Sequence, residues 1–513
     1  MYNIRQVAIH LGANCRRRIL RQSLTHGRLR FMSTIEYPPD FKPASQFAIP
    51  NCIVGQPTYH THPHMIPHGH LTCGITQAEY KERRDTFVGK LVSEINNVHK
   101  NHIIVIPAAS KQYMSDKIPY VFRQNSDFFY LTGCLEPSAV LVLLKPAQTE
   151  NYKSILFVHE KDSHAELWEG PRTGCGVAAP LFAVDEAHPV ETFNNFIHKT
   201  SSSLRPGVIW YHNESPANPD LHESVRSVLR QGQVSLEDPQ RTLHLMRVVK
   251  SDAEVELMKE TCYIGSQAMN MAMACTKPGI SEHLVGAVHE FSVRQGGAEH
   301  AAFPPVVAGG DRATHIHYVA NNQLLAAHEL LLVDAGSQRW LYNSDISRTW
   351  PVCGTFSKYH RILYELVLTV QKRLIELLGE QRPPLDQLFE QMCRLLGAQL
   401  QHEGIIDRNI DSNELIGRAY RLCPHHVSHY LGLDVHDAPL VRRRTPVRPG
   451  MIVTVEPGIY IRPDDDSVPK EFRGVGIRIE DDVLVTEGEP LVLSAACVKE
   501  VDDIEALVGK QNL

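Results

Sequence analysis

Four acidic residues stand inside or at the ends of apolar, strand-like runs of this chain, and they limit the folds open to it. Asp334 follows Leu330–Val333, and Asp345 comes eleven residues later, after a polar turn. Glu456 ends the run MIVTVE, and Glu480 ends the run GVGIRIE. Each acid alone could face solvent at the end of a strand. An isolated buried carboxylate, however, is strongly unfavourable unless it is paired or bound to a metal. Four such acids together therefore point to one shared cation site.

A histidine-rich stretch adds imidazole groups to these carboxylates. Residues 423–439 read CPHHVSHYLGLDVHDAP and contain four histidines. A zinc-binding metalloprotease helix needs helical context and a glutamate between its two histidines. Here Pro424 precedes the histidines, Gly432 interrupts the run, and LGLDVHD alternates as a strand does. We therefore reject the zinc helix.

The residue types indicate which metals would fit. The separation of Asp334 and Asp345 suits two paired antiparallel strands that face their acids toward each other. One imidazole among four carboxylates is an oxygen-rich set of donors, which favours Mn²⁺, Fe²⁺ or Co²⁺ over a thiolate-type zinc site. Two divalent ions about 3.5–4 Å apart would balance the four negative charges and hold a water between them as hydroxide. The expected cofactors are thus two divalent metal ions, with Mn²⁺ as the preferred ion.

Length and composition exclude several classes of protein. With 513 residues the chain exceeds what one hydrophobic core usually serves, so we expect two or three domains. No apolar run approaches the roughly 18–20 residues of a membrane helix, so no membrane insertion is expected. The formal net charge of −6 does not indicate a basic surface for binding nucleic acid. The eleven cysteines lack a CxxC pair or a regular spacing, which indicates thiols in a reducing compartment.

The N-terminus differs in charge from the rest of the chain. Residues 1–35 hold seven arginines and no acid, so taking their +7 from the total of −6 leaves −13 on the remainder. An arginine-rich, acid-free segment is typical of a mitochondrial transit peptide, and a disordered basic tail is the alternative. We expect this leader to be removed and the mature protein to lie in the mitochondrial matrix, with a cytoplasmic pool also allowed. Residues 36–72, rich in Pro, His, Thr and Gly, predict an extended linker.

The remaining chain divides near residue 241. From 73 to 240, apolar runs such as HIIVIPA and AVLVLLKP alternate with polar helical stretches, which is typical of an α/β domain. From 241 to 513, capped helices surround the strand-like runs that hold the four acids. Ser251, for example, predicts the start of a long helix that ends before Pro278. The fold class expected for the whole chain is α+β.

Five motifs in the second part resemble those of the pita-bread metallopeptidases. They are Asp334-Ala-Gly, Ser344-Asp345-Ile-Ser-Arg-Thr, the His429 run, Val455-Glu456-Pro-Gly-Ile-Tyr460 and Gly476-Ile-Arg-Ile-Glu480-Asp-Asp. In the first part, residues 113–144 and ELWEGPRTG (166–174) resemble the creatinase-like α/β domain that precedes the catalytic domain of aminopeptidase P. The chain thus resembles the aminopeptidase P family, and its leader and residues 303–324 look closest to the mitochondrial Xaa-Pro aminopeptidases. The resemblance implies a C-terminal pita-bread domain with the metal site of that family.

The resemblance also implies roles for single residues. By it, Asp334 and Asp345 bind one metal, His429 and Glu456 bind the other, and Asp345 and Glu480 bridge the two. The catalytic residues would be Glu456, as carrier of a proton, and three histidines that are not ligands, His317, His425 and His436. The substrate-binding residues would be Tyr460 and Arg478 near the metals, and Arg172 and Phe129 in the N-terminal domain. His315 and His426 are expected to be bystanders.

The implied activity is removal of the N-terminal residue from peptides and proteins that have proline at the second position. A prolidase-type dipeptidase and a catalytically inactive scaffold of the same fold are the alternatives. The expected partners are Xaa-Pro N-termini and a second copy of the chain, because the N-terminal domains of this family pair subunits. The aromatic run Phe128–Tyr130 offers apolar surface for such a homodimer, unless it is buried within one subunit.

Overall fold

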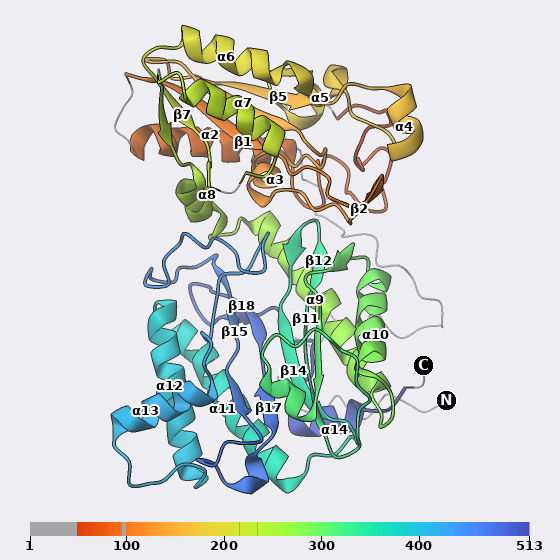
Figure 1. Ribbon diagram of the computed structural model, residues 1–513, viewed down its shortest axis with the longest axis vertical. Helices are drawn as coiled ribbons and strands as arrows, with labels where there is room; N and C mark the ends of the chain where they lie inside the picture. Colours follow the sequence, from red (N-terminus) through yellow and green to blue (C-terminus); the bar gives the residue numbers. More distant parts are fainter. Residues whose placement is uncertain (1–48, 95–98, 215, 233, 512–513) are drawn as a thin grey trace. The chain divides into compact units, whose positions relative to one another are not determined.

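The computed structural model describes residues 49–94, 99–214, 216–232 and 234–511. The predicted leader, residues 1–35, lies outside these ranges. The described chain mixes helices and strands throughout, as the α+β prediction requires (Figure 1). Across the same residues, no helix combines the length and the apolar character that crossing a membrane would need.

A six-stranded mixed sheet forms the centre of the N-terminal half, in the order β6-β5-β4-β1-β7-β8. Its strands are β1 (Asn101–Pro107), β4 (Val140–Lys145), β5 (Lys153–Val158), β6 (Glu186–Pro189), β7 (Gly207–Trp210) and β8 (Val234–Glu237). The helices of this half are α2 (Gln77–Glu94), α3 (Ser126–Thr132), α4 (Ser163–Glu169), α5 (Cys175–Phe182), α6 (Phe193–Ser203) and α7 (Pro219–Leu229), with the 3₁₀ turn η2 (Val190–Thr192). A short hairpin consists of β2 (Tyr113–Ser115) and β3 (Ile118–Pro119).

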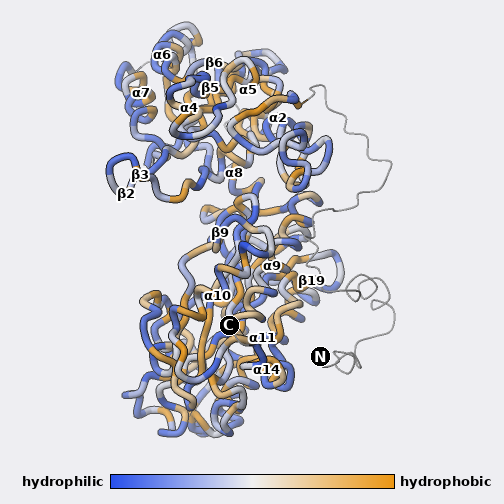
Figure 2. Tube along the Cα trace, turned by 90° about the vertical axis from the view of Figure 1, so that its right-hand side faces the viewer, coloured by the Kyte–Doolittle hydropathy of each residue, from blue (hydrophilic) through white to orange (hydrophobic). Residues whose placement is uncertain are grey.

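Both faces of this sheet are buried, which explains the uninterrupted apolar runs of its strands. Successive side chains of a strand point to opposite faces. Ile104 and Ile106 of β1 pack with residues of α2, α3 and α5, whereas Ile103 and Val105 pack with residues of α6 and α7. Figure 1 shows α6 and α7 on one side of the sheet and α2 and α3 on the other. Hydrophobic segments accordingly occur around β5 in Figure 2.

Residues 49–72, the described part of the expected linker, contain no helix or strand. Their side chains nevertheless contribute to the core of the N-terminal half. Ile66 is 1% exposed and Leu71 is fully buried, and both belong to the hydrophobic cluster that includes Tyr80 of α2. The limits predicted for the linker and for the two domains stay predictions.

In the C-terminal half, antiparallel strands lie between long helices (Figure 1). One sheet contains β10 (Val306–Gly309), β11 (Leu330–Ala335) and β14 (Ile346–Pro351), and a second contains β15 (Ile452–Val455), β18 (Asp481–Leu484) and β19 (Leu491–Val492). The other strands are β9 (His300–Ala301), β12 (Ser337–Arg339), β13 (Tyr342–Asn343), β16 (Gly458–Ile461) and β17 (Val475–Arg478). The helices are α8 (Gln240–Arg247), α9 (Asp252–Cys275), α10 (Glu282–Gln295), α11 (Lys358–Glu380), α12 (Leu385–His402), α13 (Ser412–Leu422) and α14 (Val501–Leu507), with the 3₁₀ turns η3 (Gly310–Thr314) and η4 (Lys470–Phe472).

Helix starts follow the local signals of the sequence. The Ser251 hydroxyl accepts a hydrogen bond from the Glu254 amide at 3.2 Å, and the Glu254 carboxylate accepts one from the Ser251 amide at 2.9 Å. This reciprocal capping box begins α9 where the sequence predicted a helix start. The helix ends at Cys275, before Pro278, so the prediction for its end is confirmed as well.

Two local expectations differ from the structure. Phe128, Phe129 and Tyr130 lie in α3 and are 0%, 1% and 4% exposed, so they offer no surface to a second subunit. Burial within one subunit, the alternative for this aromatic run, therefore holds. Residues 431–437, whose alternation predicted a strand, form a loop instead. Alternation alone does not supply a partner strand: Leu431 donates to the carbonyl oxygen of Ile452 in β15 and Gly432 accepts from the amide of Asn343 in β13, but no ladder continues along the segment in the described chain.

A buried cluster of charges fixes that loop. Arg247 of α8 donates to Asp127 of α3 at 2.7 Å, to Asp434 at 2.6 Å and to Asp437. Lys250 donates to Asp437 at 3.0 Å. A Cβ atom on Gly432 would lie 2.5 Å from the Asp437 carboxylate and 2.9 Å from the Lys250 side chain, so a larger residue there would displace this ion pair. The loop that carries His436 is thus held by ion pairs rather than by a strand ladder.

Candidate active site

The ends of two strand pairs bring the four predicted acids together. Asp334 lies on β11, and Asp345 immediately precedes β14, which pairs antiparallel with β11. Glu456 directly follows β15, and Glu480 directly precedes β18, which pairs antiparallel with β15. The pairing that the spacing of Asp334 and Asp345 predicted is present. Each strand pair contributes two carboxylates at one of its ends.

Three of the predicted ligands form a compact group. Asp345, His429 and Glu480 each offer one donor atom, and these atoms all lie within 4.8 Å of one another. His429 Nε2 is 3.3 Å from Asp345 Oδ2 and 3.7 Å from Glu456 Oε1. The Ser347 hydroxyl donates to Glu480 Oε2 at 2.7 Å and so fixes that carboxylate. One ion could contact several of these donor atoms.

Asp334 begins a chain of hydrogen bonds along one wall of the site. Arg478 Nη2 donates to Asp334 Oδ2 at 2.7 Å, and Arg478 Nη1 donates to the Tyr460 hydroxyl at 2.7 Å. The same hydroxyl lies 2.9 Å from His425 Nε2. Asp334 Oδ1 is buried and has no hydrogen-bond partner among the described residues. Buried polar atoms are normally satisfied, so this oxygen is free to bind a ligand.

The excess of carboxylates shifts the protonation equilibria of the site. Burial raises the pKa of Glu456 to about 7 and the pKa of Asp334 to about 6. Burial, with repulsion by Asp345, holds the pKa of Glu480 well above its usual range. Burial alone would lower the pKa of His429, but its hydrogen bond with Asp345 and the charge of Glu456 raise it to about 9. The site holds more negative charge than its own cationic groups neutralise, which favours cations.

Two of the other three predicted histidines, His425 and His436, contact this group. The ring of His436 meets the ring of His429 edge to face, with 73° between the ring planes and centroids 4.5 Å apart, and His436 is exposed. His425 Nδ1 lies 3.5 Å from Glu456 Oε2. His317 follows η3 in an exposed loop. Burial lowers the pKa of His425 to about 4, and the charges of Arg478 and His317 add to this effect.

The two expected bystanders have other contacts. The ring of His426 stacks on Phe389 of α12 with centroids 5.0 Å apart, and its Nε2 lies 3.5 Å from Asp386 Oδ1. His315 Nδ1 lies 3.3 Å from the carbonyl oxygen of Arg312. Neither imidazole contacts one of the four acids within the described part of the chain.

Comparison with known proteins identifies the family. Residues 256–487 match the metallopeptidase family M24, and residues 80–210 match the aminopeptidase P N-terminal domain. Xaa-Pro aminopeptidase 3 of Homo sapiens is 40% identical over 478 residues, which are 92% of this chain and 94% of that protein. The chain belongs to the aminopeptidase P family.

Further members extend the likeness to mitochondrial proteins and to solved structures. "Intermediate cleaving peptidase 55, mitochondrial" of Arabidopsis thaliana is 35% identical over 463 residues, 89% of this chain and 88% of that protein. The crystal structure of Icp55 from Saccharomyces cerevisiae has a TM-score of 0.77 at 32% identity and covers 86% of this chain and 99% of that one. The structure of Zn-substituted Escherichia coli aminopeptidase P in complex with product has a TM-score of 0.75 at 31% identity. It covers 84% of this chain and 98% of that one. The predicted architecture, a pita-bread domain after an aminopeptidase P N-terminal domain, is confirmed.

Aminopeptidase P enzymes of this metallopeptidase family hold divalent metal ions, and the residues present here fit such ions. The donors are carboxylate oxygens and one imidazole nitrogen, which suit divalent cations. Asp334 Oδ1 lacks a protein partner, and the pKa values of Glu456 and Glu480 are raised by burial among like charges. A bound cation would give Asp334 Oδ1 a partner and would stabilise the charged forms of Glu456 and Glu480.

Two residues predicted to contact substrate lie in the N-terminal half. Phe129 is 1% exposed within the core of that half, so its ring is not open to a ligand. Arg172 lines a cavity of about 350 Å³ together with Lys111, Glu136 and His159. No contact joins Phe129 or Arg172 to the four acids in the ranges that the structure describes.

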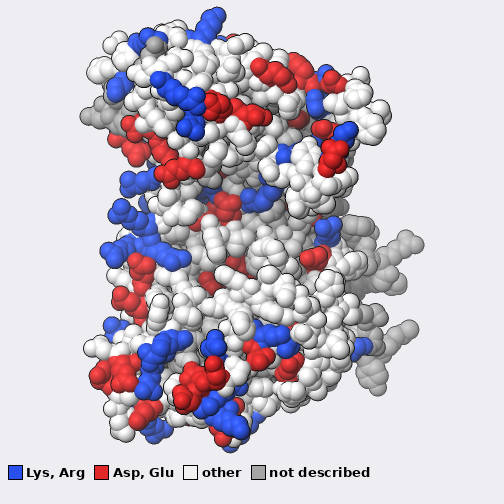
Figure 3. Space-filling model, in the orientation of Figure 1, with Lys and Arg blue, Asp and Glu red and all other residues white. Residues whose placement is uncertain are grey.

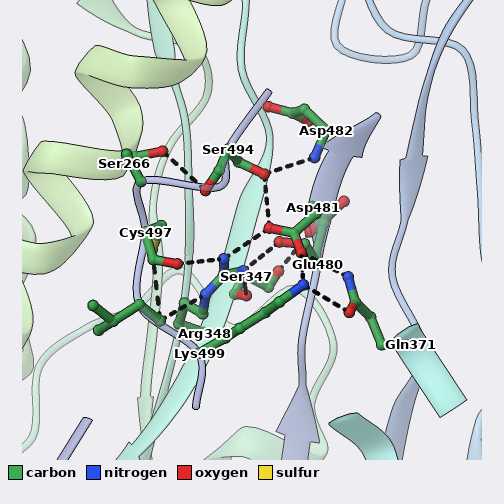
Figure 4. Close-up of polar contacts among 12 residues, drawn as sticks. Ser266, Ser347, Arg348, Gln371, Glu480, Asp481, Asp482, Ser494, Cys497 and Lys499 are labelled. Atoms are coloured by element: carbon green, nitrogen blue, oxygen red, sulfur yellow. Dashed lines mark hydrogen bonds and ion pairs between the residues drawn. The ribbon is translucent and has the colours of Figure 1, made fainter. Parts of the chain in front are cut away.

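The sequence analysis missed a buried network behind the predicted metal ligands, which Figure 4 shows. Arg348, next to Ser347 on β14, donates to the carbonyl oxygens of Ser347, Glu480, Cys497 and Val498 and to the Asp481 carboxylate. Asp481 also accepts from Gln371, Ser494 and Lys499. Two features of the sequence could have indicated this network: the arginine of the Ser-Asp-Ile-Ser-Arg-Thr motif and the two acids that follow Glu480. This network ties the strands of Asp345 and Glu480 together.

Proposed function

We propose that the chain is an aminopeptidase that uses two divalent metal ions, most suitably Mn²⁺, to remove the N-terminal residue from peptides and proteins with proline at the second position. The observation that carries the proposal is the convergence of Asp334, Asp345, His429, Glu456 and Glu480 in an aminopeptidase P fold. Relatives over nearly the whole length are named Xaa-Pro aminopeptidase.

The metal ions would be held by these five residues, and they would supply an activated water and a polarised carbonyl group. Glu456 would accept the proton of the attacking water and deliver it to the proline nitrogen. That delivery is needed because an unprotonated amide nitrogen is a poor leaving group. His317 and His436 would donate hydrogen bonds to the oxygen that becomes negative in the transition state. His425 would line the substrate and hold Tyr460 in place.

Arg478 is proposed to position Asp334. Its guanidinium is 2% exposed and donates to Asp334 and Tyr460 at once. A planar guanidinium that forms two directed bonds fixes the orientation of both partners. Arg478 would thereby hold the Asp334 carboxylate and the Tyr460 hydroxyl in fixed positions relative to each other.

Proline explains why a dedicated enzyme is needed. Its ring fixes φ near −65° and removes the amide hydrogen, so the bond before it fits poorly into extended protease grooves. A prolidase-type dipeptidase uses the same metal residues and stays the alternative. A catalytically inactive scaffold would be expected to lack ligands, whereas all five ligand types are present here.

Hydrolysis of three matched substrates tests the proposal. The metal-loaded protein should cleave Xaa-Pro-Xaa tripeptides and longer Xaa-Pro peptides, and should leave Xaa-Ala-Xaa nearly intact. Cleavage of Xaa-Pro dipeptides alone would establish the prolidase alternative. Failure on all Xaa-Pro peptides with metals bound would establish the inactive scaffold.

We further propose a mitochondrial matrix location after removal of the leader, and a homodimer. The mitochondrial relative of Arabidopsis thaliana and the arginines of residues 1–35 support the location. For the dimer, exposed apolar side chains gather around β2, β3 and α4; they are Tyr113, Met114, Ile118, Tyr120, Val121, Leu167 and Trp168. A monomer mass in light scattering at working concentration would refute the dimer.

A further inference from the structure

Consecutive exposed arginines follow the loop of His436. Arg442, Arg443, Arg444 and Arg448 lie between that loop and β15, and all four are exposed. We call residues 442–448 the arginine loop. Figure 3 shows Lys and Arg side chains gathered at the left of the face in view, at the height of this loop, which Figure 1 draws in blue above α12. The loop is a local exception, because the chain beyond the leader carries a formal charge of −13.

The charges of the arginine loop are largely unpaired. Arg444 Nε approaches Asp386 Oδ2 at 3.5 Å, and the Arg444 side chain is still 88% exposed. Among the described residues, Arg442, Arg443 and Arg448 form no ion pair. Arg361 and Arg373 of α11, by contrast, contact glutamates of their own helix at 2.9 Å. Among the described residues, single exposed arginines such as Arg205 and Arg294 also form no ion pair, so the distinctive feature of the loop is that its arginines are adjacent. Like charges that are left together and unpaired repel one another, so a solvated surface gains no stability from them.

Contacts link the arginine loop to the active site. The carbonyl oxygen of Arg443 accepts a hydrogen bond from the Asp386 amide at 3.2 Å. The Asp386 carboxylate lies 3.5 Å from His426, the neighbour of His425 in the chain. On its other side the arginine loop begins six residues after His436. The arginine loop therefore lies beside His426 and follows the loop of His436, in the same part of the chain as the predicted ligand His429.

We infer that the arginine loop binds acidic side chains of the polypeptide substrate a few residues beyond the scissile bond. The inference rests on the proposed aminopeptidase function and specifies its preferred substrates as Xaa-Pro N-termini followed by Asp and Glu. An extended chain covers about 3.3–3.6 Å per residue, so side chains a few positions beyond proline come level with a surface that borders the site. Arginine binds carboxylates through two parallel hydrogen bonds, and unpaired guanidinium groups are free to form them.

Charge attraction of this kind acts on capture of the substrate rather than on the chemical step. A cationic surface beside a cleft raises the rate of association of anionic ligands, and salt weakens this effect. The preference should therefore appear in kcat/KM and decrease with ionic strength. The kcat value for a tripeptide too short to reach the loop should not change.

The test uses the metal-loaded protein and two peptides, Tyr-Pro-Gly-Asp-Glu-Asp-Gly and its neutral counterpart Tyr-Pro-Gly-Asn-Gln-Asn-Gly. The wild type should cleave the acidic peptide with a kcat/KM about tenfold higher than the neutral one at low salt. Arg442→Gln/Arg443→Gln/Arg444→Gln should lose this preference and keep the wild-type kcat on a neutral Xaa-Pro-Xaa tripeptide. The matched control, Arg361→Gln/Lys372→Gln/Arg373→Gln on α11, removes the same charge elsewhere and should keep the preference.

Equal rates for the two peptides in the wild type, or equal losses in the triple variant and its control, would overturn the inference. Binding of both peptides measured by fluorescence anisotropy provides the same comparison where no peptide is cleaved, so failure of the aminopeptidase function is distinguishable. An anionic membrane surface is the competing occupant. If the triple variant loses only its binding to phosphatidylglycerol vesicles while the peptide preference persists, the loop belongs to a membrane contact and the inference is wrong.

Discussion

Asp437→Asn removes a carboxylate that faces two cations inside the protein. Lys250 Nζ lies 3.0 Å from Asp437 Oδ2, and both side chains are 1% exposed. Arg247 contacts the other oxygen of the same carboxylate. Breaking a buried ion pair costs about 3–5 kcal/mol, because the remaining charge stays buried without its partner. We expect the free energy of unfolding at pH 7 to fall by about that amount.

The effect should depend on pH in a defined direction. Burial alone would raise the pKa of Asp437, but Lys250 and Arg247 lower it to about 2. The carboxyl group of an unfolded chain titrates near 3.9, so the folded protein binds this proton more weakly than the unfolded chain does. The stabilisation is therefore present above about pH 4 and is lost as the pH falls from about 4 to 2. A shift of this size corresponds to roughly 2–3 kcal/mol.

Urea unfolding followed by tryptophan fluorescence at pH 7, 5, 4 and 3 measures both effects. The control is Glu365→Gln, which breaks the exposed pair with Arg361 at 2.9 Å and should cost less than about 0.5 kcal/mol. Peptidase kcat should also fall in Asp437→Asn, because Asp437 fixes the loop of His436. Unfolding of Asp437→Asn at the urea concentration of the wild type would refute the reasoning.

Three further predictions concern the metals, the ligands and the leader. EDTA should abolish peptidase activity, Mn²⁺ should restore it best, and elemental analysis should find two ions per chain; a fully active protein with a single zinc would contradict this. Asp345→Ala and Glu480→Ala should each lower kcat/KM by more than about a hundredfold, since each is proposed to be a ligand of both ions. His426→Ala should retain most activity, and a loss as large as that of His429→Ala would show that the division of the histidines is wrong. Replacing the arginines at positions 16, 17, 18 and 21 by glutamine should leave a folded, active protein in the cytosol; unchanged mitochondrial import would count against a cleavable leader.

Signals that act over a few residues predicted the structure best. Ser251 and Pro278 mark the two ends of α9 because capping and helix breaking depend on neighbouring backbone groups. The strand pairing of Asp334 and Asp345 was predictable for the same reason, because the two acids are only eleven residues apart. The polar turn expected between them was wrong: this segment forms the mostly buried hairpin of β12 and β13. The helical, buried state of Phe128–Tyr130 depends on distant partners such as Tyr80, and nothing in the run itself reveals them.

The candidate site was predictable where a residue type was chemically out of place. Acids in apolar strands are unusual enough to indicate a shared cation. The roles of Arg348 and Asp481 were not predictable, because the two residues pair with each other across 133 positions of the chain. An arginine beside a strand looks the same in sequence whether it is exposed or forms five buried hydrogen bonds.

The five hydrogen bonds of Arg348 bear on when the protein acquires its ions. Protein groups alone satisfy the guanidinium, so the strands of Asp345 and Glu480 are held in place by the chain itself. The free energy of metal binding is then hardly needed to fold the chain, in contrast to domains that fold only around their metal. Metal ions should therefore exchange in the folded enzyme. Which divalent ion binds should depend on the concentrations of metal ions in the compartment and on the affinity of the site for each ion. The same polypeptide would then change its metal when it changes its surroundings, without refolding.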